Sequence, residues 1–208
     1  MGHKLNPLAN VTKQPLTHTT IMKIHSLLQS RNELGKFFNW LGLTGEGAEI
    51  GVLHGEYSLE ILRHWKGHTL HLVDAWSNTI EDYADPISEI DLEQVYQKML
   101  ENIEPYRDRV KIHRLLSNVA ASRFSDNSLD FVYIDADHCY ERVKEDIAIW
   151  SEKVRSGGVL CGHDFLTNDN PRQLVGVERA VKEFCEERGV EELLLTQCSF
   201  PSWLIRKI

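Results

Sequence analysis

Short apolar runs that alternate with amphipathic helical segments are the feature of this sequence that most restricts its fold. Five such runs lie at 48–53, 69–75, 110–116, 129–136 and 158–162. Between the last two, four apolar residues recur at helical spacing, at Val143, Ile147, Trp150 and Val154. Alternating buried strands and helices are typical of a parallel sheet with helices on both faces. The pattern therefore predicts an α/β chain with a doubly wound sheet.

The end of the sequence departs from this alternation. A helix is expected from Val177 to the turn at Gly189. Beyond it, apolar runs at 193–197 and 203–208 flank a turn at 200–202, which predicts an antiparallel hairpin. The expected sheet is thus mostly parallel and ends in a C-terminal antiparallel hairpin.

The beginning of the chain has a different character. Residues 1–16 hold few periodic apolar positions and are expected to form an arm, and helices are expected at about 20–28 and 34–41. We therefore divide the chain into an N-terminal arm with helices, 1–44, and a main domain, 45–208.

An insertion is expected at about 77–105, after the second apolar run. Its first part, 77–90, fits neither strand nor helix periodicity, and its second part has helical spacing. Ligands of open α/β sheets bind at the carboxyl ends of the strands, where this insertion begins. A cover over a substrate and a plain solvated loop both remain open for 77–90.

Composition limits the partners that this chain can have. Its 208 residues carry a formal net charge of −8, which repels nucleic acid phosphates and anionic membrane surfaces. The sequence shows no membrane span, no secretory signal and no CxxC pair among its four cysteines. A cytoplasmic protein that acts on a small molecule is expected. Phe37 and Trp40, which we expect to be exposed, favour a homodimer.

A glycine turn follows the first apolar run, in the string EIGVLHGEYS that begins at Glu49. Gly51 and Gly55 let a ligand lie against the backbone, and the amino end of the next helix favours a carboxylate or phosphate. A dinucleotide fingerprint would read GxGxxG, and its third glycine is absent here. The turn predicts a ligand site and argues against a bound pyrophosphate.

Asp74 ends the second apolar run. It follows Gly51 at about the interval where an acidic side chain meets the ribose of a bound nucleoside. A carboxylate can accept hydrogen bonds from both ribose hydroxyls. A surface aspartate at a strand end is the alternative, but the turn and Asp74 together predict a nucleoside site.

Four strings carry a resemblance to a known family: EIGVLHGEYS, LVDAW, FVYIDADHCYERVKEDIAIW and GGVLCGHDF. Together they resemble the class I S-adenosylmethionine-dependent methyltransferases. IDADHxY followed by GGxxxGHD is the most specific part, and it is similar to the branch of small-molecule and sugar O-methyltransferases that contains macrocin O-methyltransferase. The resemblance covers about residues 45–208. It implies the Rossmann-like class I methyltransferase fold and S-adenosylmethionine as cofactor, which has a ribose and a carboxylate but no pyrophosphate.

The resemblance also implies which residues bind that cofactor. They are Glu49, Gly51, Gly55, Tyr57, Ser58, Asp74, Ala75, Trp76, Ser117, Asn118 and Asp135. Tyr57 and Ser58 would lie near the cofactor carboxylate, and Asp74 would bind the ribose. Ser117 and Asn118 would contact the adenine end.

A divalent metal is a further implication of the resemblance. In metal-dependent relatives, the first aspartate of IDADH and an acidic pair after the next strand bind the cation, and Asp135, His163 and Asp164 stand at these positions. Because one ligand is a histidine, Mn²⁺, Fe²⁺ or Zn²⁺ would suit the set better than Mg²⁺. The alternative is that Asp135 and Asp164 only cap strands or orient the cofactor.

Methyl transfer to a hydroxyl is an in-line displacement that needs a group to take the acceptor proton. The candidates are Asp137, His138 and His163, of which Asp137 matches the base of some sugar-methylating relatives. The prediction is methyl transfer from S-adenosylmethionine to a small-molecule acceptor, at a hydroxyl of a sugar or another metabolite. A non-catalytic S-adenosylmethionine-binding module and a nicotinamide-dependent oxidoreductase are the alternatives.

Overall fold

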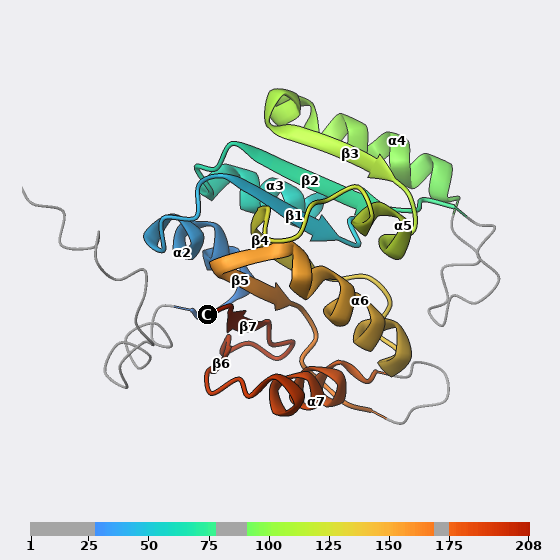
Figure 1. Cartoon of the computed structure of the whole chain (residues 1–208). Helices are drawn as coiled ribbons and strands as arrows, with labels where there is room; N and C mark the ends of the chain where they lie inside the picture. Colours follow the sequence, from blue (N-terminus) through green and yellow to red (C-terminus); the bar gives the residue numbers. More distant parts are fainter. Residues whose placement is uncertain (1–27, 78–90, 169–174) are drawn as a thin grey trace, which may run out of the picture.

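The computed structural model of the chain describes residues 28–77, 91–168 and 175–208 (Figure 1). The expected arm at 1–16, nearly all of the helix expected at about 20–28, and segment 78–90 lie outside the described residues. None of the helices in the described part has the length and apolar character that a membrane span requires.

A seven-stranded sheet forms the centre of the fold, in the order β3-β2-β1-β4-β5-β7-β6. The strands are β1 (Glu46–Ile50), β2 (Thr69–Asp74), β3 (Val110–Arg114), β4 (Leu129–Ile134), β5 (Val154–Gly162), β6 (Leu193–Leu195) and β7 (Trp203–Arg206). Strands β1 to β5 are parallel, whereas β7 runs antiparallel to both β5 and β6. The predicted doubly wound, mostly parallel sheet with a C-terminal antiparallel hairpin is confirmed.

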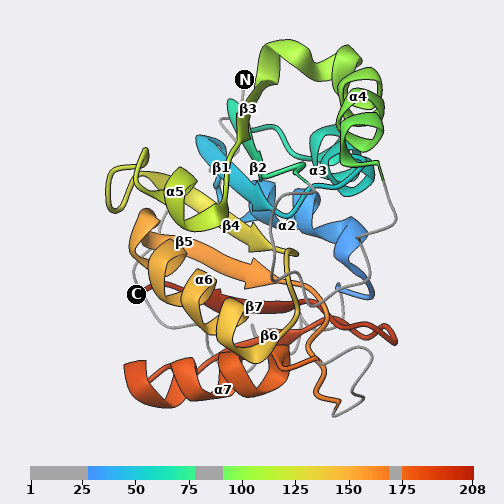
Figure 2. The same ribbon diagram turned by 90° about the vertical axis from the view of Figure 1, so that its right-hand side faces the viewer.

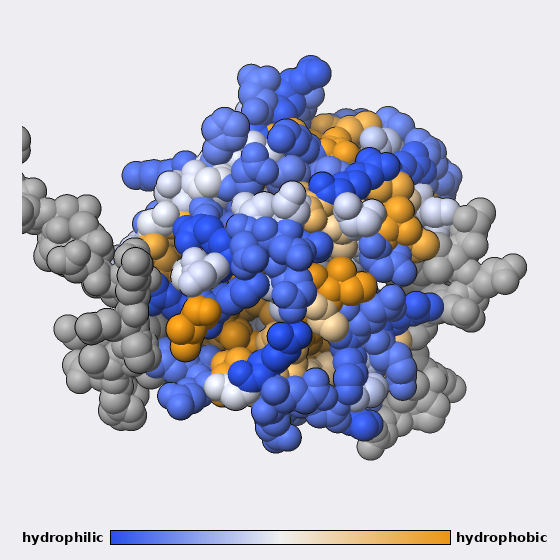
Figure 3. Space-filling view, in the orientation of Figure 1, coloured by the Kyte–Doolittle hydropathy of each residue, from blue (hydrophilic) through white to orange (hydrophobic). Residues whose placement is uncertain are grey.

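Helices cover both faces of the sheet (Figure 2). One face carries α2 (Leu34–Trp40), α3 (Glu56–His64) and α4 (Leu92–Ile103), and the other carries α5 (Ser117–Ala121), α6 (Tyr140–Lys153) and α7 (Val177–Arg188). Successive strand residues point to opposite faces, so Phe131 and Tyr133 belong to the first core and Val132 and Ile134 to the second. Hydrophilic residues predominate on the surface shown in Figure 3, with the apolar residues in separate patches.

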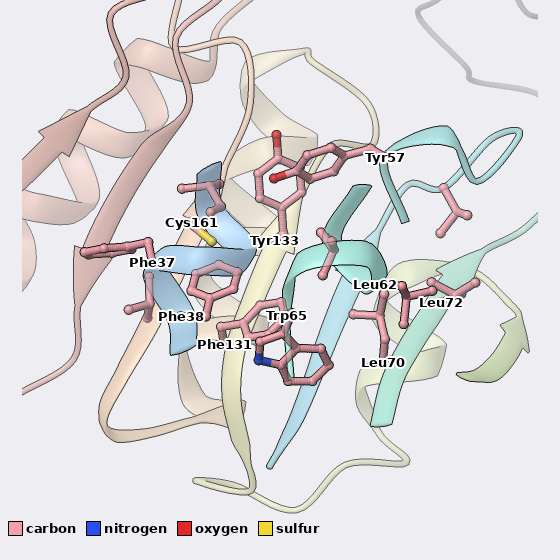
Figure 4. Close-up of a cluster of buried hydrophobic side chains, with 14 of the residues drawn as sticks. Phe37, Phe38, Tyr57, Leu62, Trp65, Leu70, Leu72, Phe131, Tyr133 and Cys161 are labelled. Atoms are coloured by element: carbon pink, nitrogen blue, oxygen red, sulfur yellow. The ribbon is translucent and has the colours of Figure 1, made fainter. Parts of the chain in front are cut away.

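The core on the α3 side is built around Phe131 (Figure 4). The Phe38 ring of α2 stacks on Phe131 with the centroids 4.0 Å apart, and Trp65 meets the same ring edge-on at 5.0 Å. A Cβ on Gly47 would lie 2.3 Å from the Phe131 ring, so this strand position has no room for a side chain. Helix α2 is therefore part of the same core as the sheet.

The expectation that Phe37 is exposed is wrong. Phe37 is 8% exposed as a residue, while Trp40 is 38% exposed. Phe37 lies on the inner side of α2, within the core that Val159 of β5 and Leu204 of β7 also enter. A homodimer stays a prediction, and of these two residues only Trp40 supports it, because only Trp40 is exposed.

The second half of the expected insertion forms α4. Its apolar residues Leu92, Val95, Met99 and Ile103 are buried in the core on the α3 side. Helix α4 is thus a member of the helical layer. The alternative that the insertion covers a substrate concerns residues 78–90, which lie outside the described residues.

The loops after β1, β2, β4 and β5 meet at one edge of the sheet, because the carboxyl ends of parallel strands point the same way. The turn of the β6–β7 hairpin reaches this edge. The Phe165 N–H donates to the Pro201 carbonyl at 2.9 Å, and the Tyr133 hydroxyl lies 3.3 Å from Ser202 Oγ. The hairpin is therefore tied to β4 and to the loop after β5.

Two histidines form a hydrogen-bonded pair on the α5 face of the sheet. His71 Nδ1 lies 2.9 Å from His113 Nε2, and His71 Nε2 lies 2.9 Å from Glu46 Oε2. If the Nε2 proton of His71 goes to the carboxylate, His113 Nε2 must donate to His71 Nδ1. Burial lowers the pKa of both histidines, that of His113 to about 4. Both rings are therefore neutral at pH 7 in the folded chain.

We expect the substitution His113→Gln to reduce the acid sensitivity of folding. Because the folded pKa is lowered, the neutral ring stabilises the fold above about pH 6.5, and this contribution is lost as the pH falls toward 4. Between pH 7 and pH 5, wild type should lose about 1 kcal/mol more unfolding free energy than the variant, with allowance for the partial exposure of the ring.

Urea unfolding at the two pH values measures this difference. His64→Gln, outside the pair, is the matched control and should behave as wild type. Equal losses in wild type and His113→Gln would contradict the expectation.

Candidate active site

The turn after β1 lies against the loop after β4. Gly51 has a φ of 84°, in the left-handed region that favours glycine, and a Cβ there would lie 2.2 Å from the backbone oxygen of Asp135. Gly55, the residue before α3, has a φ of 74°. The backbone therefore requires glycine at both positions, at Gly51 also because of the close approach to Asp135.

The Asp74 carboxylate holds this turn in place. Its Oδ2 accepts the backbone N–H groups of Val52 at 2.9 Å and Leu53 at 3.0 Å, and its Oδ1 accepts that of Trp76 at 2.9 Å. The end of β2 is thereby joined to the turn after β1. Asp74 has this structural role in addition to any contact with a ligand.

A pocket opens beside the turn and extends to α6. It measures about 770 Å³ with the open space at its mouth included. Six residues expected from the sequence to bind the cofactor or act in catalysis line it: Gly51, Asp74, Ala75, Ser117, Asn118 and Asp137. The structure therefore brings together at one pocket residues from the ends of β1, β2, β3 and β4.

One wall of the pocket holds a buried polar group that sequence reasoning missed. Ser117 Oγ donates to Asp146 Oδ1 and accepts the Trp150 indole N–H at 2.8 Å. Burial raises the pKa of Asp146 to about 6. The signal was present in the sequence, because Asp146 is an acidic residue beside Ile147 on the inward stripe of its helix.

Five residues expected to contact the cofactor are buried and lie outside the pocket lining: Glu49, Gly55, Tyr57, Ser58 and Trp76. Ser58 Oγ donates to Glu49 Oε2 at 2.5 Å between β1 and α3. The Trp76 indole N–H donates to the Leu53 carbonyl at 2.9 Å. The Glu49 side chain points toward α3, because its neighbours Ala48 and Ile50 in β1 belong to the core on the opposite face. Glu49, Ser58 and Trp76 support the turn from within the fold.

A charged cluster lies at the carboxyl ends of β4 and β5. His138 Nε2 is 3.0 Å from Asp164 Oδ2 and 3.6 Å from Asp135 Oδ1. His163 Nδ1 is 3.2 Å from Asp164 Oδ1 and 3.7 Å from Asp135 Oδ1. Burial alone would raise the pKa of Asp164, but the close contacts with the His138 and His163 rings hold it below its usual range. Asp164 is therefore ionised and orients both rings.

Arg31 completes the cluster from the 3₁₀ helix η2 (Arg31–Glu33). Its Nη1 donates to Asp135 Oδ2 at 2.8 Å, and its guanidinium carbon lies 4.6 Å from the centroid of the Tyr57 ring. The Tyr57 hydroxyl donates to the Arg31 carbonyl at 3.0 Å, and Figure 4 shows Tyr57 beside Tyr133. Sequence reasoning missed Arg31, because no motif surrounds it and its partner lies 104 residues away.

The expected metal ligands Asp135, His163 and Asp164 meet in this cluster, together with His138. Ligand atoms of Asp135, His138 and Asp164 lie within 4.8 Å of one another. As arranged, however, this donor set does not fit a divalent ion. Asp135 Oδ2 is paired with Arg31, so a divalent ion at this carboxylate would lie beside the guanidinium and be repelled by it. We therefore derive no step of a reaction through a metal.

A family model described as a methyltransferase domain matches residues 48–165 of the chain. The chain belongs to this methyltransferase family. No curated protein matches the sequence of this chain. The family and the class I fold predicted from the sequence are confirmed, while the macrocin-like branch stays a prediction.

Solved structures similar to this methyltransferase share its architecture at low identity. An O-methyltransferase from Bacillus cereus in complex with SAH has 18% identity and a TM-score of 0.60, over 95% of this chain and 94% of that one. TomG from Streptomyces achromogenes, an O-methyltransferase involved in tomaymycin synthesis, in complex with SAM, has 13% identity and a TM-score of 0.60, over 96% and 93%. At these identities the likeness shows the fold.

We expect the substitution Glu49→Gln to stabilise the methyltransferase, and more so at high pH. Burial raises the pKa of Glu49 to about 8, so its contribution to stability is present below about pH 4.5 and is lost as the pH rises through 8. Glutamine stays neutral and can still accept the Ser58 hydroxyl. The gain in unfolding free energy should be larger at pH 8 than at pH 5 by more than about 1 kcal/mol.

The measurement is urea unfolding at both pH values, with Glu191→Gln on the exposed surface as the control. A gain that is the same at pH 5 and pH 8 would show that Glu49 is ionised in the fold at neutral pH.

Proposed function

We propose that this methyltransferase transfers a methyl group from S-adenosylmethionine to a hydroxyl of a small molecule, such as a sugar or another metabolite. The observation that carries the proposal is the pocket at Gly51, Asp74 and Ser117. Its lining includes Ala136 and Asp137, which follow Asp135 of the charged cluster directly in the chain. The similar proteins from Bacillus cereus and Streptomyces achromogenes are O-methyltransferases in complex with SAH and SAM, which supports this choice of cofactor and reaction.

The pocket lining suits the nucleoside of that cofactor. The two oxygens of Asp74 offer about four acceptor positions, and backbone N–H groups take three of them, which leaves capacity for a ribose hydroxyl. Ala75, Ser117 and Asn118 border the part of the pocket that we assign to adenine. The methionine part then extends past Gly51 toward Asp135.

S-adenosylmethionine supplies the methyl group on a sulfonium, so the leaving sulfur needs no proton. What the chain must supply is a position for the acceptor in line with the methyl carbon and a base for the hydroxyl proton. Asp137 lines the nucleoside pocket and accepts the Cys139 N–H at 2.8 Å. His138 lies in the charged cluster, 3.0 Å from Asp164.

We therefore assign the base to His138 among the three candidates. It takes the proton of the acceptor hydroxyl, and the ionised Asp164 stabilises the imidazolium that forms. His163, which faces the same carboxylate, would help to fix the position of Asp164.

We expect S-adenosylmethionine to bind the wild-type chain in calorimetry and to bind Asp74→Asn at least tenfold more weakly. The amide has one acceptor oxygen in place of two, so it cannot hold the turn and meet the ribose together. Gly51→Ala should weaken binding further, because a Cβ would collide with the Asp135 carbonyl.

Asp108→Asn, in the 3₁₀ helix η4 (Glu104–Arg109), is the matched control for binding. No binding to wild type at millimolar cofactor would reject the proposal. Tight binding of reduced nicotinamide cofactor instead would favour the oxidoreductase alternative.

We expect His138→Gln to slow methyl transfer by about 10²- to 10⁴-fold, the usual contribution of a general base. Its affinity for S-adenosylmethionine should stay within about twofold of wild type, because His138 is outside the lining of the nucleoside pocket. The measurement is release of S-adenosylhomocysteine with a panel of hydroxylated acceptors.

Asp137→Asn is the comparison variant, and it should affect cofactor affinity more than turnover. A turnover loss confined to Asp137→Asn would transfer the role of base to Asp137. Intact cofactor binding with no product from any acceptor would favour a non-catalytic module.

A further inference from the structure

Arg31 is fixed at the charged cluster at three points. Its guanidinium pairs with Asp135 Oδ2 at 2.8 Å and lies over the Tyr57 ring at 4.6 Å. Its backbone carbonyl accepts the Tyr57 hydroxyl at 3.0 Å. A guanidinium suits this position, because its planar group can stack on an aromatic ring and bind a carboxylate at once, which an ammonium cannot do as well.

One of the two carboxylate oxygens of Asp135 is already paired with a cation. Oδ2 carries the Arg31 guanidinium, and Oδ1 faces His138 and His163 at 3.6 and 3.7 Å. A divalent ion at Oδ1 would lie next to the guanidinium on Oδ2, and the two positive charges would repel each other. Binding of a divalent ion and binding of Arg31 at Asp135 therefore oppose each other.

We propose that Arg31 takes the place of the divalent cation at this site, and that it supplies the fixed positive charge next to the acceptor oxygen. This inference rests on the proposed methyl transfer. A positive charge there favours the ionised form of the acceptor hydroxyl. The O–H proton goes to His138, the acceptor oxygen forms the new bond to the methyl carbon, and the C–S electron pair leaves with sulfur as S-adenosylhomocysteine.

The test measures the binding of Mn²⁺ alone to the protein, and the readout is the loss of the free-ion signal in electron paramagnetic resonance. Wild type should bind Mn²⁺ at least tenfold more weakly than Arg31→Gln, in which Asp135 becomes available. Adding Asp135→Asn to Arg31→Gln should remove the gain. Lys36→Gln is the matched control, since it removes one positive charge from the exposed side of the adjacent helix α2, and it should bind Mn²⁺ as wild type does.

Arg31→Lys keeps the charge and should keep the Mn²⁺ affinity low, which separates the charge from a general disturbance of η2. If circular dichroism shows that Arg31→Gln does not fold, the wild-type chain by itself still tests the proposal. Mn²⁺ binding to wild type that Asp135→Asn abolishes would overturn the proposal, and so would equal affinities of wild type and Arg31→Gln.

Cofactor binding distinguishes this failure from failure of the proposed function. If wild type binds S-adenosylmethionine but also binds Mn²⁺ at Asp135, the methyl transfer stands and the role of Arg31 falls. If wild type does not bind S-adenosylmethionine, the proposed function falls whatever the Mn²⁺ result. Turnover of wild type should be unchanged after chelation with EDTA, and a tenfold loss of turnover would also count against the proposed role of Arg31.

Discussion

The close contact between Gly51 and the backbone of Asp135 connects the two parts of the site. A Cβ at Gly51 would lie 2.2 Å from the Asp135 carbonyl oxygen, so a side chain there would push the turn after β1 away from the loop after β4. The same turn is bound by Asp74 through the N–H groups of Val52 and Leu53. The nucleoside pocket and the charged cluster are thus held at a fixed separation by backbone contacts.

The charged cluster is assembled from separate parts of the chain, and its charged groups pair with one another inside the protein. Asp135 follows β4, Asp164 follows β5, and Arg31 comes from η2. Two carboxylates thereby face one guanidinium and two imidazoles. The electrostatics of the cluster depend on Arg31, a residue outside the part of the chain that the family model matches.

Much of the fold could be predicted from the sequence, because strands buried on both faces alternate with helical stripes. The pocket residues Gly51 and Asp74 could be predicted too, since each follows from the local geometry of a strand end. The direction in which Glu49 points could not be predicted. Its neighbours Ala48 and Ile50 in β1 are also buried, and in a strand that is buried on both faces the sequence does not show toward which face a side chain points. Arg31 could not be predicted either, since its contact with Asp135 joins residues that are remote in the sequence and leaves no local pattern.

The antiparallel position of β7 between β5 and β6 has a consequence for how the site is assembled. A two-stranded hairpin is marginally stable by itself, so β6 and β7 become stable when β7 gains β5 as a second neighbour. The hairpin turn then meets Phe165 and Tyr133 at the functional edge. Docking of the hairpin and the arrangement of that edge are therefore coupled, because the same contacts hold both in place.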